Sequence, residues 1–326
     1  MRSVLAFCYT RRNQHAKVCP YTLHLASAKE MLRDPSRRRP AHSLASESGY
    51  ERSMKLEDYR GLVEALLPAV LAAGRIEMRH FKSGVEVSTK ADTTPVTVAD
   101  HEAEDVLTAA LHRAMPGVPV IAEEAVAAGL IPATEDAFFL VDPLDGTRAF
   151  IKGSPEFTIN IGLVVAQRPL FGIIYAPALN ELYATVGPRE SVEAEIAPDD
   201  TAETLTSAKL TRLATREPDR EALVAFASRS HASQSTDEFL ERLPIAEKRK
   251  ASSSLKFCLI ARGEADLYAR LGQTSEWDTA AGHAILAAAG GCVTTLEGEP
   301  LLYGKRDGGF ANPHFIAWGR EPLLSP

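Results

Sequence analysis

Two carboxylates stand three residues apart in the segment Asp142-Pro-Leu-Asp-Gly-Thr147, directly after the apolar stretch 138–141. Pro143 and Gly146 allow the backbone to turn back sharply, so both carboxylates can face one crevice beyond the end of a predicted strand. Oxygen ligands without a neighbouring His or Cys suit a hard divalent cation such as Mg²⁺. Gly146 and Thr147 would then begin a helical turn whose N–H groups can hold a phosphate. A plain Asp-Gly turn without a ligand is the alternative interpretation.

Three other segments carry carboxylates at predicted element boundaries. Glu123-Glu124 follows a predicted strand and could add an oxygen ligand, although paired loop acids are often merely solvated. Asp278, in Trp277-Asp-Thr-Ala-Ala-Gly282, opens a predicted helix, where an N-cap is the ordinary role of Asp. Asp100 ends the segment Lys90-Ala-Asp-Thr-Thr-Pro-Val-Thr-Val-Ala-Asp100 and could cap the following helix. Each segment is weak evidence by itself, whereas all four in this order form a specific pattern.

The elements that must position these residues follow from hydrophobic periodicity. Apolar residues recur every three or four positions from Leu56, which predicts an amphipathic helix toward Phe81 that Pro68 should kink or restart. Residues 157–165 and 170–176 are predicted as paired strands, and the acidic stretch 189–206 as a surface loop with weak strand character. The other predicted elements are a turn at 92–95, a strand that ends at 123, strands at 85–89, 138–141, 223–228, 245–248, 265–270, 292–296 and 314–318, and helices at 99–115, 234–242, 253–262 and 278–290. Periodicity alone therefore indicates an α/β fold with mixed sheets.

The composition is that of an ordinary globular protein, with 45% hydrophobic and 24% charged residues among 326. This excludes a wholly disordered, collagen-like or disulfide-scaffold chain. No apolar stretch reaches the roughly 18 to 20 residues of a membrane span, so we expect no stable membrane insertion. A net charge of −7 argues against broad attraction to nucleic acid. Four scattered cysteines without a CxxC pair favour a reducing compartment.

The charge is unevenly distributed along the chain. Residues 1–53 hold ten Lys/Arg and four Asp/Glu and carry +6, which leaves −13 on residues 54–326. The first segment lacks a sustained period and is predicted to be a disordered basic extension. The favoured explanation of this extension is a start codon assigned too early, with Met54 as the true first residue. An organellar transit peptide and an RNA-binding arm are the alternatives.

Taken together, the four segments resemble the inositol monophosphatase superfamily of Mg²⁺-dependent, lithium-sensitive phosphatases over about residues 55–320. Within it the chain looks most like the 3′(2′),5′-bisphosphate nucleotidases of the CysQ type, which act in sulfur assimilation. That closer likeness is carried by the stretches Arg148-Ala-Phe-Ile-Lys152, Glu156-Phe-Thr-Ile-Asn-Ile161, Ser228-Arg-Ser-His231, Ser253-Ser-Leu-Lys-Phe-Cys258 and Tyr268-Ala-Arg-Leu-Gly-Gln-Thr-Ser-Glu-Trp-Asp278. The resemblance implies removal of the 3′-phosphate from adenosine 3′,5′-bisphosphate, giving AMP and phosphate, and for some members action on its sulfated precursor.

The resemblance also implies a set of metal ligands. One Mg²⁺ would be bound by Glu123, Asp142 and the backbone carbonyl of Leu144, and a second would be shared by Asp142, Asp145 and Asp278. Asp100, Thr147 and Glu123 are the expected catalytic residues. Asp100 with Thr147 would position or deprotonate the attacking water, and a third, weakly bound Mg²⁺ would also touch Asp100. The amides of Gly146 and Thr147 would hold the scissile phosphate.

The second phosphate of so anionic a substrate requires cationic side chains. Lys256 and Arg270 are the first candidates, and Arg229 and Lys152 are the next. His231, Ser253 and Ser254 are expected to contact the sugar or base, and Asp278 also borders the substrate. For each of these side chains the alternative is an ordinary surface charge or cap.

Two positions depart from the family pattern, because Ala122 replaces the usual Gly before the paired glutamates and Ala149 stands where relatives commonly carry Glu. Neither change removes an expected ligand. The alternative functions are an inositol monophosphatase or other sugar phosphate monoesterase, and a non-catalytic nucleotide or metal sensor.

The family fold implied is a layered αβαβα sandwich. Residues 54–326 would form the phosphatase domain, with a metal-binding lobe at about 54–190 and a substrate-binding lobe at 205–326. The implied partner is a small-molecule phosphorylated nucleotide. The implied location is cytoplasmic, or in association with the inner face of the bacterial membrane. The sequence makes no prediction of the oligomeric state.

Overall fold

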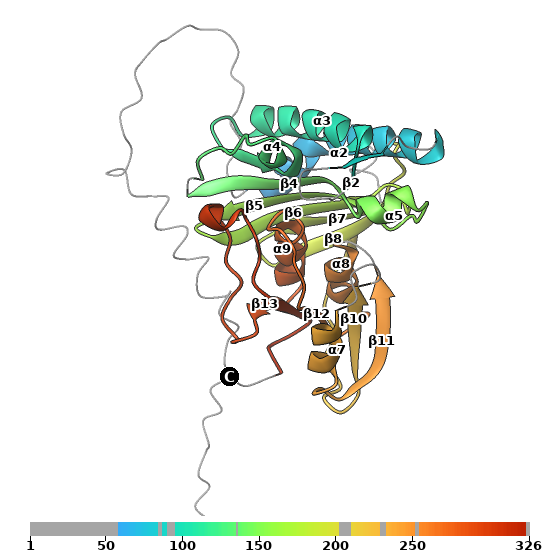
Figure 1. Ribbon diagram of the computed structural model, residues 1–326, viewed down its shortest axis with the longest axis vertical. Coiled ribbons are helices and arrows are strands. Elements are labelled where there is room, and N and C mark those ends of the chain that lie inside the picture. Colours follow the sequence, from blue (N-terminus) through green and yellow to red (C-terminus); the bar gives the residue numbers. More distant parts are fainter. Residues whose placement is uncertain are drawn as a thin grey trace, which may run out of the picture.

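Figure 1 shows the computed structural model, which describes residues 58–83, 87–89, 95–134, 136–201, 210–228, 233–251 and 254–323. The predicted basic extension 1–53 and most of the predicted turn at 92–95 lie outside these ranges. So do Lys90 and three expected substrate-contacting residues, Arg229, His231 and Ser253.

A seven-stranded sheet forms the first half of the molecule. Only its edge pair, β3 and β4, is parallel, and the other neighbouring strands are antiparallel. In spatial order the strands are β3 (Val120–Ala122), β4 (Ala137–Asp145), β5 (Thr158–Val165), β6 (Arg168–Ala176), β7 (Glu181–Gly187), β8 (Glu190–Glu195) and β9 (Thr211–Arg212). Residues 157–165 and 170–176 are thus confirmed as paired strands.

Two helices, α2 (Tyr59–Ser83) and α3 (Val98–Ala114), cover one face of this sheet (Figure 1). The apolar side of α2 packs onto the strands with the other core residues of this layer. Pro68 lies inside α2 on its exposed side, so the expected restart of the helix is wrong, while the expected kink stays a prediction. The hydrogen bond that Pro68 cannot donate would end on the carbonyl of Glu64, which is exposed, and water can satisfy that group. A hairpin of β1 (Val87–Thr89) and β2 (Pro95–Thr97) leads into α3.

Helix α9 (Ala280–Ala288) lies against the opposite face of the seven-stranded sheet, in contact with β5, β6 and β7. It approaches closely because Gly162 and Gly172 are paired on adjacent strands and present no side chain to it. Helix α8 (Leu255–Ala261) packs beside α9. These two helices form the middle layer (Figure 1).

A five-stranded sheet covers the other side of α8 and α9. Its strands, in spatial order, are β11 (Ile245–Ala251), β10 (Leu223–Ser228), β12 (Leu267–Arg270), β14 (Phe315–Trp318) and β13 (Cys292–Thr295). Alternate residues face opposite layers, as strand geometry requires. For example, Phe226 and Tyr268 pack with α8 and α9, whereas Ala225 and Leu267 pack with α7 (Gln234–Leu240).

The layers therefore run helix, sheet, helix, sheet, helix, and the predicted αβαβα sandwich is confirmed. The predicted elements of the second half are present with ends shifted by a few residues. The division into lobes at 54–190 and 205–326 stays a prediction. Among the described residues, no helix combines the length and the apolar character that a membrane crossing requires.

The acidic stretch 189–206 was predicted as a surface loop with weak strand character, and its first part is a strand; residues 202–206 lie outside the described ranges. Residues Glu190–Glu195 form β8, which pairs with β7 along its length. Val192 and Ala194 are buried on the sheet. Glu190 and Glu195 are exposed, whereas Glu193 is half-buried and lies 3.0 Å from Arg262 Nε. The three glutamates make the segment look like a surface loop in the sequence, although its alternate apolar residues fit a strand.

Candidate functional site

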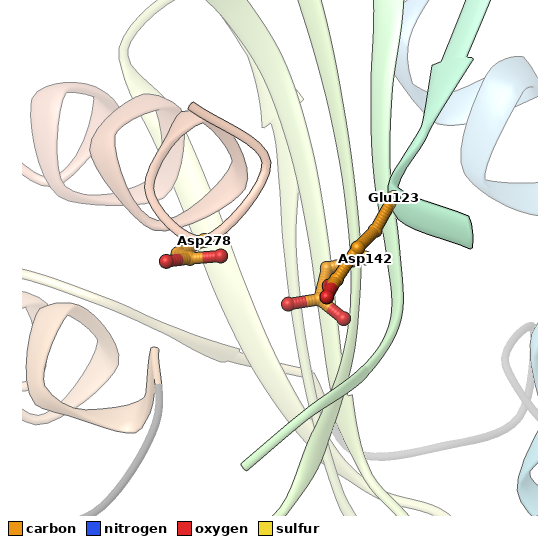
Figure 2. Close-up of side chains that lie close together, drawn as sticks. All are labelled: Glu123, Asp142 and Asp278. Atoms are coloured by element: carbon orange, nitrogen blue, oxygen red, sulfur yellow. The ribbon is translucent and has the colours of Figure 1, made fainter. Parts of the chain in front are cut away.

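Glu123, Asp142 and Asp278 bring carboxylate oxygens to within 4.8 Å of one another, although they come from three distant parts of the chain. Figure 2 shows Glu123 and Asp142 side by side and Asp278 facing them from the end of α9. Like charges at this separation repel one another unless a cation or protons compensate them. The donor set contains only oxygen, which fits a hard divalent metal such as Mg²⁺.

Strand pairing brings the first two carboxylates together. Strands β3 and β4 are parallel, and Ala122 pairs with Val141. The residues that follow them, Glu123 and Asp142, therefore emerge side by side at the same edge of the sheet. Ala122 has φ −111° and ψ 145°, an extended conformation open to any residue, so replacing the family's Gly costs no backbone strain here.

The Asp142-Pro-Leu-Asp segment does not turn as sharply as expected. Strand β4 continues to Asp145, and its pairing with β5 shifts between Asp142 and Asp145, which marks a bulge. Within the bulge, Asp142 Oδ1 accepts a hydrogen bond of 3.0 Å from the Leu144 amide. The sharp turn comes instead at Gly146, whose φ of 93° lies in the left-handed region that glycine adopts at low cost.

Asp278 lies in the turn before α9, and the N-cap of that helix is Thr279, so the alternative interpretation of Asp278 as the N-cap is wrong. Its Oδ2 accepts a hydrogen bond of 2.9 Å from the Ser275 amide. Burial, followed by the charges of Asp145 and Glu123, raises the pKa of Asp278. The ionised form of Asp278 is therefore costly at this position unless a cation compensates its charge.

Asp145 lies near this cluster but is held separately. Its Oδ2 accepts hydrogen bonds from the Ser254 amide at 2.7 Å and from Asn160 Nδ2 at 3.4 Å. The Ser254 hydroxyl donates to Asn160 Oδ1 at 2.8 Å, and the Ser254 side chain is buried. The structure thus places Ser254 where it orients Asp145, and its expected contact with a nucleotide stays a prediction.

Asp100 caps α3 and also lies beside Thr147, while its role toward a water molecule stays a prediction. Its Oδ2 accepts the Thr97 amide at 2.8 Å and the Thr97 hydroxyl at 2.6 Å, which completes a capping box at the start of α3. Its Oδ1 lies 3.5 Å from the hydroxyl of Thr147, which is also 3.2 Å from the Leu144 carbonyl oxygen. Thr147 begins the short helix α5 (Thr147–Ile151). The predicted association of Asp100 with Thr147 is therefore present in the geometry.

Lys256 and Arg270 place positive charge beside the carboxylates from the second half of the chain. Lys256 is buried, with Nζ 4.9 Å from the centre of the Tyr268 ring. Burial lowers the pKa of Lys256 to about 8, while the charge of Asp145 acts in the opposite direction. Arg270 donates to Ser228 Oγ at 3.2 Å and to the Gln273 carbonyl at 2.8 Å. Lys152, by contrast, is exposed.

Sequence reasoning missed Glu104, a buried carboxylate of α3. It accepts hydrogen bonds from the amides of Glu124 at 2.8 Å and Ala125 at 2.9 Å. Both amides belong to the first turn of α4 (Glu123–Ala127), so Glu104 anchors the turn that presents Glu123. The sequence did offer one sign of this role, because Glu104 is an acidic residue on the buried face of α3, four positions after Asp100.

Comparison with known proteins identifies close relatives. A model of the inositol monophosphatase family matches residues 58–321. The 3′(2′),5′-bisphosphate nucleotidase CysQ of Shigella flexneri is 40% identical over 232 residues, covering 71% of this chain and 88% of that protein. The CysQ of Escherichia coli K12 is 39% identical over 240 residues, covering 71% and 88%.

Solved structures agree with this relationship. The crystal structure of CysQ from Bacteroides thetaiotaomicron matches with a TM-score of 0.66 at 34% identity, covering 82% of this chain and 100% of that one. The inositol monophosphatase from Anabaena matches with a TM-score of 0.60 at 23% identity, covering 80% and 91%, and shows the fold alone.

Proposed function

Because the chain belongs to the inositol monophosphatase family, we propose that it is a 3′(2′),5′-bisphosphate nucleotidase that removes the 3′-phosphate of adenosine 3′,5′-bisphosphate. The products are AMP and phosphate, and the reaction depends on a divalent metal, with Mg²⁺ the expected ion. One observation carries the proposal: Glu123, Asp142 and Asp278 converge in a chain that is 40% identical to a curated nucleotidase. A cytoplasmic location is part of the same proposal.

We assign the metal ligands that the family resemblance implies. A first Mg²⁺ would be held by Glu123, Asp142 and the carbonyl oxygen of Leu144, and a second by Asp142, Asp145 and Asp278. The clustered carboxylates support this assignment. When bound, Mg²⁺ supplies positive charge that offsets the phosphate dianion and makes a water molecule more acidic.

Asp100 and Thr147 would orient the attacking water. Asp100 Oδ2 is occupied by Thr97, so Oδ1, on the side of the Thr147 hydroxyl, is the oxygen that accepts a proton from the water. The water oxygen bonds to phosphorus, the bond from phosphorus to the 3′ oxygen breaks, and that oxygen takes up a proton from solvent. A third, weakly bound Mg²⁺ at Asp100 belongs to the same proposal.

The second phosphate distinguishes this substrate from a simple sugar phosphate. Lys256 and Arg270 lie in the same region as the carboxylates, since the charges of Asp145, Arg270 and Asp278 all act on Lys256. We assign them to the 5′-phosphate, which would balance the negative charge of the substrate at the end remote from the metal.

The proposal is tested with the purified full-length protein. Phosphate release is measured from adenosine 3′,5′-bisphosphate and from inositol 1-phosphate at equal Mg²⁺, with and without a chelator. We expect the nucleotide to be preferred and the activity to disappear on chelation. A preference for inositol 1-phosphate would instead identify a sugar phosphate monoesterase, and nucleotide binding without phosphate release from either would identify a sensor.

Two carboxamide substitutions test the metal assignment. Asp145→Asn should reduce turnover by orders of magnitude while nucleotide binding survives, because the side chain keeps its size but loses its charge. Asp307→Asn makes the same chemical change on an exposed residue of the 3₁₀ helix Arg306–Gly308 and is the matched control. Unchanged turnover in Asp145→Asn would refute the role given to Asp145.

A further inference from the structure

The turn 274–279 determines where the Asp278 carboxylate points. Ser275 and Asp278 bind each other twice, since the Ser275 amide donates to Asp278 Oδ2 at 2.9 Å and the Asp278 amide donates to the Ser275 carbonyl at 3.3 Å. Asp278 therefore follows any movement of the Ser275 backbone. The position of Ser275 must come from contacts outside the turn.

Some of those contacts come from the Glu276 amide, which donates to the Phe310 carbonyl at 2.8 Å. Asn312, in the loop before β14, supplies the side-chain contacts next to Ser275. Its backbone amide donates to the Thr274 carbonyl at 2.9 Å, and its Nδ2 lies 2.7 Å from the Ser275 carbonyl oxygen and 3.0 Å from Thr279 Oγ1. Nδ2 also lies 3.3 Å from Thr274 Oγ1. A carbonyl oxygen can only accept, so the side-chain atom that faces Ser275 must be the amide nitrogen. Asn312 thus holds the turn on both sides of Asp278.

The other contacts of Thr279 leave its hydroxyl little freedom. Thr279 donates its proton to the Glu276 carbonyl at 3.2 Å and accepts from the Tyr303 hydroxyl at 3.3 Å. Because Tyr303 has only one proton to donate, His283 Nδ1, at 3.0 Å, must donate its own proton to the Tyr303 oxygen. Thr279, Tyr303 and His283 are all buried. His283 therefore donates to Tyr303, Tyr303 to Thr279, and Thr279 to the backbone of the turn.

We propose that Asn312 is a positioning residue for Asp278, which holds the turn 274–279 so that this carboxylate meets Glu123 and Asp142 at the metal centre. The inference rests on the proposed metal-dependent function. Three like charges would otherwise favour rotation of Asp278 away from the other two before metal binds. Loss of the hydrogen bonds that orient a metal-binding side chain commonly weakens metal binding by about 10-fold to 100-fold.

The test measures Mg²⁺ binding by calorimetry to the metal-free, full-length protein without substrate, together with the thermal unfolding midpoint. Asn312→Leu keeps the approximate shape but removes the donors, and Asn312→Asp places a carboxylate against the Ser275 carbonyl. Both are expected to weaken Mg²⁺ binding by about 10-fold or more. Asn312→Ser keeps a short donor, should be intermediate, and replaces Asn312→Leu if that variant does not fold.

The matched control is Thr294→Val, which removes the buried hydrogen bond of 3.1 Å from Trp318 Nε1. It should lower the unfolding midpoint but leave the Mg²⁺ dissociation constant unchanged. If the Asn312 variants lose thermal stability while they bind Mg²⁺ within twofold of the parent chain, Asn312 is only structural and the inference is overturned. If the parent chain itself fails to bind Mg²⁺, the proposed function falls, and this inference with it.

Discussion

Gly172 on β6 is a point where α9 comes very close to the seven-stranded sheet. A Cβ atom added to Gly172 would lie 2.3 Å from the carbonyl oxygen of Ala281 and 2.9 Å from its carbonyl carbon. These are backbone atoms of α9, so no side chain can rotate to relieve the clash. Gly172→Ala should therefore push the start of α9 away from the sheet.

The size of the shift follows from the contact distances. Ordinary van der Waals contact begins at 3.4 Å, so the helix must retreat by about 1 Å to make room for the methyl group. Asp278 lies three residues before Ala281, whereas Glu123 and Asp142 belong to the sheet side of the site. Because their oxygens now lie within 4.8 Å of one another, the retreat should separate Asp278 from its partners. A misplacement of this size costs about 100-fold in turnover, and overpacking costs about 1–3 kcal/mol of stability.

The assay compares kcat at saturating Mg²⁺ and Mg²⁺ binding in the parent chain and in Gly172→Ala. Gly187→Ala is the control in the same sheet, because a Cβ there would meet Glu190 Cβ at an ordinary 3.5 Å. Gly162→Ala should behave like Gly172→Ala, since its Cβ would lie 2.9 Å from the Ala281 amide nitrogen. Parent-like Mg²⁺ affinity and turnover in a folded Gly172→Ala would refute the idea that close packing of α9 sets the site.

Three further outcomes are expected. Burial lowers the pKa of His283 from 6.5 to about 3. Below pH 6.5 His283 is therefore protonated in the unfolded chain but not in the folded one. The free energy of unfolding should consequently fall by about 2 kcal/mol between pH 8 and pH 5. In urea titrations His283→Gln should remove this loss and the exposed control His112→Gln should not. Asp266→Ala deletes the buried acceptor of the Arg216 guanidinium, at 2.8 and 2.6 Å, and should lower the urea-derived stability by about 2–4 kcal/mol; a loss below 1 kcal/mol would contradict that role. With the pKa of Lys256 at about 8, the KM for the nucleotide should rise above pH 8 as the ammonium loses its charge, and Lys256→Met should have a high KM without that rise.

Local patterns were sufficient for most individual elements. The three-and-four spacing after Leu56 predicts α2, because one apolar face of a helix is a property of neighbouring residues alone. The same reasoning failed where packing overrides local chemistry. Pro68 does not restart α2, since its missing hydrogen bond falls on the solvent side, and the glutamates of β8 did not prevent a strand whose other face is buried.

The ligand chemistry was also readable from the chain, because a Mg²⁺ site needs oxygen ligands such as carboxylates whatever the fold. What the residue order could not supply is their convergence, which depends on the parallel pairing of β3 with β4 and on the approach of α9 to the sheet. It could not assign Ser254 to Asp145 or Glu104 to the turn that presents Glu123, nor single out Asn312, since each acts on a segment far away in the sequence. The chain therefore determined which groups can hold metal and phosphate. Only tertiary packing decided where they meet, because distances between remote segments are set by the fit of whole layers rather than by local backbone preference.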